Sequence, residues 1–106
     1  MKVYQFKNTS VNHGFNYFFE RVIPAHTTIA VKMPAVTANK RGINDISWQT
    51  DGDNVELYGT LSNNVGDENA LWAKIDENSE VNKAVSGLKI KNSGAACRFI
   101  IRVIMN

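Results

Sequence analysis

The chain has 106 residues, of which 43% are hydrophobic and 21% charged, and its formal net charge is +2. This length suits one domain over 1–106, and this composition is typical of a globular rather than a disordered protein. The twelve basic and ten acidic residues are scattered along the chain. Nucleic-acid binding usually needs a clustered basic face, so we expect no nucleic-acid partner. No stretch is apolar enough to span a membrane or to form a secretory signal, so we expect folding in a reducing cytoplasm.

Three strands are predicted in the first part of the chain. Residues Val3–Lys7 alternate between apolar and polar, which is the period of a strand with one buried face. The segment Phe15–Ile23 is rich in aromatic and β-branched residues and ends at Pro24, which cannot donate to a strand ladder. A third strand is expected over Thr27–Met33, followed by a connection over 35–42.

Two β-hairpins are predicted in the second part. Alternating residues of Ile46–Thr50 and Val55–Thr60 flank an Asp-Gly turn, in which glycine accepts a positive φ without a clash. Val85–Asn92 and Ala96–Met105 flank an Asn-Ser-Gly turn in the same way. Between the hairpins, Leu71–Ile75 suits either a short strand or one helical turn.

These segments together predict an all-β protein without a convincing helix. We expect an antiparallel β-sandwich of about seven to eight short strands, with a jelly roll as one topology and a barrel as a less favoured one. Cys97 is the only cysteine, so no internal disulfide forms, and its apolar surroundings predict a small buried side chain.

The final strand has an unusual second face. Alternation places Cys97, Phe99, Ile101, Val103 and Met105 toward the core, and Arg98, Ile100, Arg102 and Ile104 on the opposite face. An exposed sheet normally presents a polar face, whereas this one mixes isoleucine with arginine. Two explanations remain open, which are cover by the protein's own loops or by a neighbouring chain. Arginine suits an interface because its planar fork and apolar stem act together.

The two tryptophans raise a carbohydrate-binding alternative, because sugars stack on exposed aromatic faces. Trp48 is in phase with Ile46, which predicts a core position, and Trp72 is expected to plug one end of the sandwich. If Trp72 is instead exposed, Trp72 and Tyr58 are the candidate glycan-stacking residues.

Catalytic and metal sites are not predicted. The histidines, His13 and His26, have no cysteine, histidine or carboxylate at metal-ligand spacing. Asp51, Asp53 and Glu56 cluster at a turn, but no bidentate glutamate follows at the position that a calcium loop requires. No local nucleophile and base are arranged as a triad, so we expect a non-enzymatic protein without a cofactor.

The second half of the chain resembles small bacteriophage virion proteins of the head-decoration or head-tail accessory type. The resemblance rests on the segments Val55–Thr60, Ala70–Ile75, Val85–Gly94 and Ile100–Asn106. It implies a β-sandwich with an apolar closing strand and a virion location after synthesis in the host cytoplasm. The implied role is capsid decoration, with the major capsid protein as partner and homo-oligomer formation. A tail or head-completion component is the nearest alternative within this resemblance.

Overall fold

A computed structural model describes residues 1–5, 7–8, 16–33, 44–62, 64–67, 69–75, 81–82 and 85–105. The described residues form ten β-strands and no helix, so none of them forms a helix that is able to cross a membrane. In chain order the strands are β1 Lys2–Gln5, β2 Lys7–Asn8, β3 Asn16–Ile23, β4 Thr27–Lys32, β5 Asn44–Thr50, β6 Val55–Thr60, β7 Ala73–Ile75, β8 Val81–Asn82, β9 Gly87–Asn92 and β10 Cys97–Met105.

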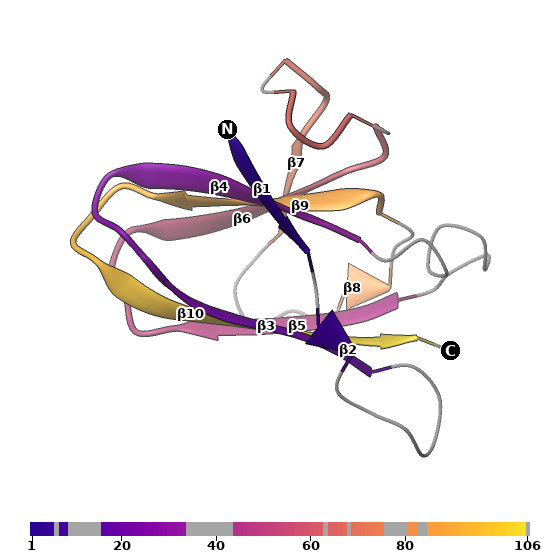
Figure 1. The fold of residues 1–106 in the computed structure, drawn as a ribbon, viewed down its shortest axis with the longest axis horizontal. Helices are drawn as coiled ribbons and strands as arrows, with labels where there is room; N and C mark the ends of the chain where they lie inside the picture. Colours follow the sequence, from indigo (N-terminus) through magenta and orange to yellow (C-terminus); the bar gives the residue numbers. More distant parts are fainter. Residues whose placement is uncertain are drawn as a thin grey trace.

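The strands form two facing sheets, as expected for a β-sandwich (Figure 1). Sheet A has the order β1-β4-β9-β6-β7, and sheet B has the order β2-β3-β10-β5-β8. Strand β1 runs parallel to β4, while the other described pairs are antiparallel. Without β1 and β2, the two orders are those of an eight-stranded jelly roll. The all-β sandwich prediction is therefore confirmed, with a jelly-roll order.

Both predicted hairpins are wrong in their pairing. Strands β5 and β6 lie in different sheets, and so do β9 and β10. Each turn is therefore an arch that carries the chain from one sheet to the other, as does the turn between β3 and β4. The three arches lie at the same end of the sandwich, on the left in Figure 1.

The core lies between the sheets and follows the predicted alternation. Its largest fully buried side chains include Phe99, Ile23, Ile46, Leu57, Leu88, Ile90 and Ile101. Trp48 stacks on Phe99, with ring centroids 5.2 Å apart and an interplanar angle of 18°. Cys97 is buried as a free thiol, as its apolar surroundings predicted.

The arch between β5 and β6 shows why glycine stands at position 52. The φ of Gly52 lies outside the left-handed region, in contrast to the prediction. A Cβ atom at this position would lie 2.7 Å from the Cys97 Sγ. Left-handed backbone occurs instead at His26, with φ of 51°, in the arch between β3 and β4. Glycine is therefore required at position 52 because a side chain would collide with Cys97, and not because the backbone has left-handed dihedral angles.

The predicted strand over Val3–Lys7 is split between the two sheets. Strand β1 extends the edge of sheet A beside β4, and β2 pairs with β3 in sheet B. Tyr4 packs beside Phe19, with ring centroids 6.0 Å apart, so this segment covers one side of the sandwich. The connection predicted over 35–42 lies outside the described residues, as does His13.

Candidate interaction surfaces

The outer face of sheet B contains the arginine and isoleucine residues singled out in the final strand. Strand β10 is central in this sheet, with β3 on one side and β5 on the other. Directly paired residues of an antiparallel sheet point to the same face. The resulting rows across β3, β10 and β5 are Val22–Arg98, Glu20–Ile100–Gln49 and Phe18–Arg102–Ser47.

This face is open to solvent. Arg98 and Arg102 are exposed, Ile100 and Phe18 are half-buried, and Val22 is 58% exposed. The protein's own described chain therefore leaves Arg98, Arg102 and Val22 uncovered, whereas it partly covers Ile100 and Phe18. Ile104 lies on the same strand in register with Asn16 and Asp45, but its side chain is outside the described part of the structure.

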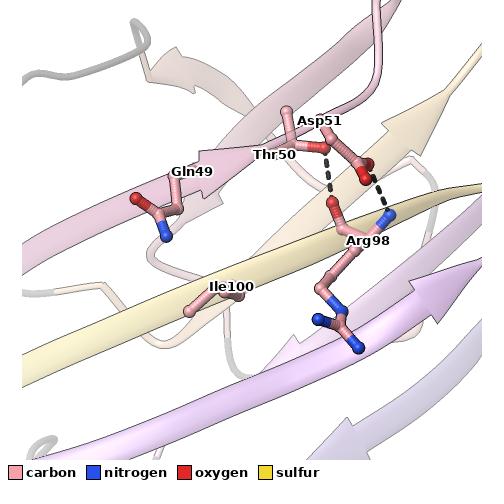
Figure 2. Close-up of a pocket in the computed structure, with 5 residues that line it drawn as sticks. All are labelled: Gln49, Thr50, Asp51, Arg98 and Ile100. Atoms are coloured by element: carbon pink, nitrogen blue, oxygen red, sulfur yellow. Dashed lines mark hydrogen bonds between the residues drawn. The ribbon is translucent and has the colours of Figure 1, made fainter.

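A shallow hollow of about 370 Å³ lies at the arch end of this face. Its lining residues are Gln49, Thr50, Asp51, Arg98 and Ile100, and Figure 2 shows Ile100 between the side chains of Gln49 and Arg98. The backbone of Arg98 is fixed on both sides. Its N–H donates to the Asp51 Oδ1 at 2.8 Å, and its carbonyl accepts a hydrogen bond from the Thr50 hydroxyl at 2.7 Å.

The hollow combines apolar, amide and charged side chains. The Thr50 hydroxyl donates to the Arg98 carbonyl, so its proton is already engaged in a hydrogen bond. Ile100 gives the hollow an apolar floor, and Gln49 contributes an amide. Arg98 contributes a guanidinium, and the backbone of this residue is held in place by the two hydrogen bonds. Asp51 adds a carboxylate to the same lining, so the hollow presents an acceptor as well as the Arg98 guanidinium.

The expected position of Trp72 in the core is wrong. Trp72 is half-exposed at the outer face of sheet A, and its Nε1 donates to the Asp67 carbonyl at 3.3 Å. Tyr58 lies on the same face, and the Lys89 ammonium lies over both rings, 4.7 Å from the Tyr58 centroid and 4.9 Å from the Trp72 centroid. The structure thus brings the two candidate glycan-stacking residues together around a lysine.

Tyr58 also interacts with Glu56. The Lys74 Nζ lies 3.2 Å from the Glu56 Oε2, and this contact lowers the pKa of Glu56. Loss of solvent raises the pKa of the Tyr58 phenol, and the charge of Glu56 together with the hydrogen bond to its carboxylate raises it further. Because the unfolded phenol ionises at lower pH than the folded one, this site loses stability as the pH rises past the ordinary tyrosine pKa.

Replacing Glu56 with glutamine tests this coupling. We expect Glu56→Gln to move the tyrosinate absorbance titration of Tyr58 to lower pH, because the carboxylate charge no longer opposes ionisation. The pKa should stay above the ordinary value, since burial is the larger cause. Glu20→Gln, on the other sheet, is the matched control, and an equal shift in both variants would contradict the assignment.

Other candidate chemistry is sparse in the described residues. His26 is exposed in an arch, and no group of three or more histidine, cysteine, aspartate or glutamate side chains is placed to hold a metal ion within the ranges that the structure describes. Comparisons with protein-family models, curated proteins and solved structures find no match to this chain.

Sequence reasoning missed the residues that complete both surfaces. Val22 and Phe18 extend the face of β10, but their partnership with Arg98 and Arg102 depends on a register between segments about 80 residues apart. Lys89 was missed for the same reason, because only pairing with β6 brings it beside Tyr58. The outward phase of Lys89 was available from the buried Leu88 and Ile90 on either side.

Proposed function

We propose that this protein is a non-enzymatic structural subunit of a bacteriophage particle, with capsid decoration as its most specific role. The observation that carries the proposal is the open face of β10 in sheet B. There, the exposed Arg98, Arg102 and Val22 and the half-buried Ile100 and Phe18 form one surface. The resemblance of the second half of the chain to small virion proteins is the reason for proposing a bacteriophage particle as the assembly.

The composition of this face supports attachment to another protein. Arginine and aromatic residues are enriched at protein interfaces, and a few well-packed positions supply most of the binding energy. The face is continuous because its residues lie on hydrogen-bonded strands, and the hollow beside Ile100 gives it a recess. The proposed partners are the major capsid protein and further copies of this chain.

Charge reversal at Arg102 tests the interface. Arg102 is exposed, and no ion pair joins it to another described residue, so Arg102→Glu should change the free energy of unfolding by no more than about 0.5 kcal/mol. If Arg102 anchors the partner, the same change should weaken assembly by about 2 kcal/mol or more, roughly thirtyfold. Thermal melting and size-exclusion or particle-binding assays measure the two effects separately.

The matched control is Lys32→Glu, which makes the same charge change on the outer face of sheet A. It should leave assembly unchanged. Normal assembly of Arg102→Glu would show that the face is idle, and severe unfolding would show that the face is covered from within. Mass spectrometry of purified particles tests the location, and absence of this chain from mature virions would overturn the proposal.

A further inference from the structure

The outer face of sheet A is basic and carries two aromatic rings. Its rows across β4, β9 and β6 are Thr28–Lys91–Glu56, Ala30–Lys89–Tyr58 and Lys32–Gly87–Thr60, and Lys74 of β7 lies beside Tyr58. Four lysines thus share this described face with one glutamate. Glu56 is paired with Lys74, which leaves Lys32, Lys89 and Lys91 without an ion pair to another described residue.

Lys89 is held in a defined position. Its ammonium lies within 5 Å of the centroids of both the Tyr58 and the Trp72 ring. Cation–π contact with two rings restricts a side chain that otherwise has many rotamers, so less entropy is lost when the ammonium binds an anion. Lys91, two residues further along β9, lies about 7 Å away along the strand.

The loop between β6 and β7 forms a wall over one end of this face, so Thr60 and Gly87 are buried although their row faces outward. Val65 is buried against Gly87, where a Cβ atom would lie 2.5 Å from the Val65 Cγ1. The Thr60 hydroxyl donates to the Leu71 carbonyl at 2.8 Å, and the Trp72 indole donates to the Asp67 carbonyl. These contacts fix Trp72 at the border between the wall and the sheet, so the rings around Lys89 are positioned before any ligand binds.

We propose that the outer face of sheet A binds an anionic polysaccharide, with the Lys89 ammonium between the Tyr58 and Trp72 rings as its anchor. A carboxylate or sulfate group pairs with Lys89, and the next acidic group along the polymer reaches Lys91. The apolar C–H faces of the sugar rings pack against the exposed parts of Tyr58 and Trp72.

This chemistry favours an acidic polysaccharide over a neutral one or a nucleic acid. Neutral sugars depend on stacking against aromatic rings, and here the ammonium already covers one face of each ring. A single-stranded nucleic acid also offers phosphates to the ammonium, but its unpaired bases need an open ring face on which to stack. An acidic sugar uses the ammonium instead of displacing it. The inference does not rest on the proposed function, because the outer faces of sheets A and B lie on opposite sides of the sandwich (Figure 1).

Calorimetric titration with four probes tests the proposal. The probes are dextran sulfate, polygalacturonate, neutral dextran and a thymidine oligonucleotide. We expect binding to at least one of the two acidic polymers, no binding to neutral dextran, and a loss of about tenfold in affinity in Lys89→Gln, as for one charge-assisted hydrogen bond. Lys91→Gln should weaken binding less and gives a second readout should Lys89→Gln prove unstable.

Lys2→Gln is the matched control. The Lys2 ammonium also lies over a tyrosine ring, 5.2 Å from the Tyr4 centroid, but Lys2 pairs with the inward-facing Ile29 and lies off the outer face. Lys2→Gln should bind like the wild type, and equal losses in both variants would reduce the effect to net charge and overturn the proposal. Failure of both acidic polymers to bind would overturn it too, as would tighter binding of neutral dextran or of the oligonucleotide.

Discussion

Replacing Phe99 with alanine is expected to destabilise the protein by about 3–5 kcal/mol. Phe99 is fully buried in β10, the central strand of sheet B, and its ring stacks on Trp48. The substitution removes that ring and leaves a cavity between the sheets, which the neighbouring strands cannot close because their hydrogen bonds hold them in register.

Thermal or urea unfolding measures this loss. A domain of this size should melt roughly 12–20 °C lower, at about 4 °C for each kcal/mol. Trp48 fluorescence should change in the folded variant as well, because the stacked ring is gone. Val22→Ala, an exposed position on the adjacent β3, is the control and should cost no more than about 0.5 kcal/mol. Similar losses in both variants would mean that Phe99 is not a core residue.

The sequence was sufficient to predict the burial pattern of β5 and β10. Alternation in β10 assigned Phe99 and Ile101 to the core and Arg98 and Arg102 to the opposite face, because a side chain on a strand has only two directions. The same reasoning placed Trp48 correctly. The burial of these side chains follows from the alternation along each strand, and that alternation can be read from a single sequence without knowing how the strands pair.

Strand pairing was not predictable in the same way. An Asp-Gly turn between alternating segments fits a hairpin and an arch equally well, since both bury one face of each segment. The choice depends on which strands offer hydrogen-bonding edges, and β5 and β6 find these in β10 and β9. These edges belong to strands that are distant in the sequence, so the two residues of the turn do not determine whether a hairpin or an arch forms.

Trp72 is a case in which the available signal was overlooked. Ile75 is buried and faces inward, so Lys74 and Trp72 share the outward phase of β7 and the residue before it. Nearby apolar residues suggested a plug, yet Leu71 is 89% exposed. The position of Trp72 relative to the buried Ile75 therefore predicts its exposure better than its apolar neighbours do. It places Trp72 on the outer face that carries Lys89.

The sandwich also depends on one buried amide at its arch end. The Asn92 side chain is almost fully buried, and its Nδ2 lies at hydrogen-bond distance from the carbonyls of Ile23, Pro24 and Ala95, between 2.9 and 3.2 Å away. Its Oδ1 accepts a hydrogen bond from the Gly94 N–H at 3.0 Å. One side chain therefore ties the arch between β3 and β4 to the arch between β9 and β10.

Asn92→Ala is expected to cost about 3 kcal/mol, because it leaves buried carbonyls without a donor. Asn92→Asp should cost more at neutral pH, since a carboxylate of the same shape would face those carbonyls, and its pKa should rise above the ordinary aspartate value. With the pKa of the folded aspartate raised, the extra loss of stability should be greatest above that pKa and should disappear as the pH falls to the pKa of the unfolded chain.

Unfolding of both variants between neutral and acid pH measures this pattern. Asn54→Ala, an exposed residue of the neighbouring arch, should stay within about 0.5 kcal/mol of the wild type. A pH-independent difference between Asn92→Ala and Asn92→Asp would show that the amide does not bridge the arches through its N–H groups.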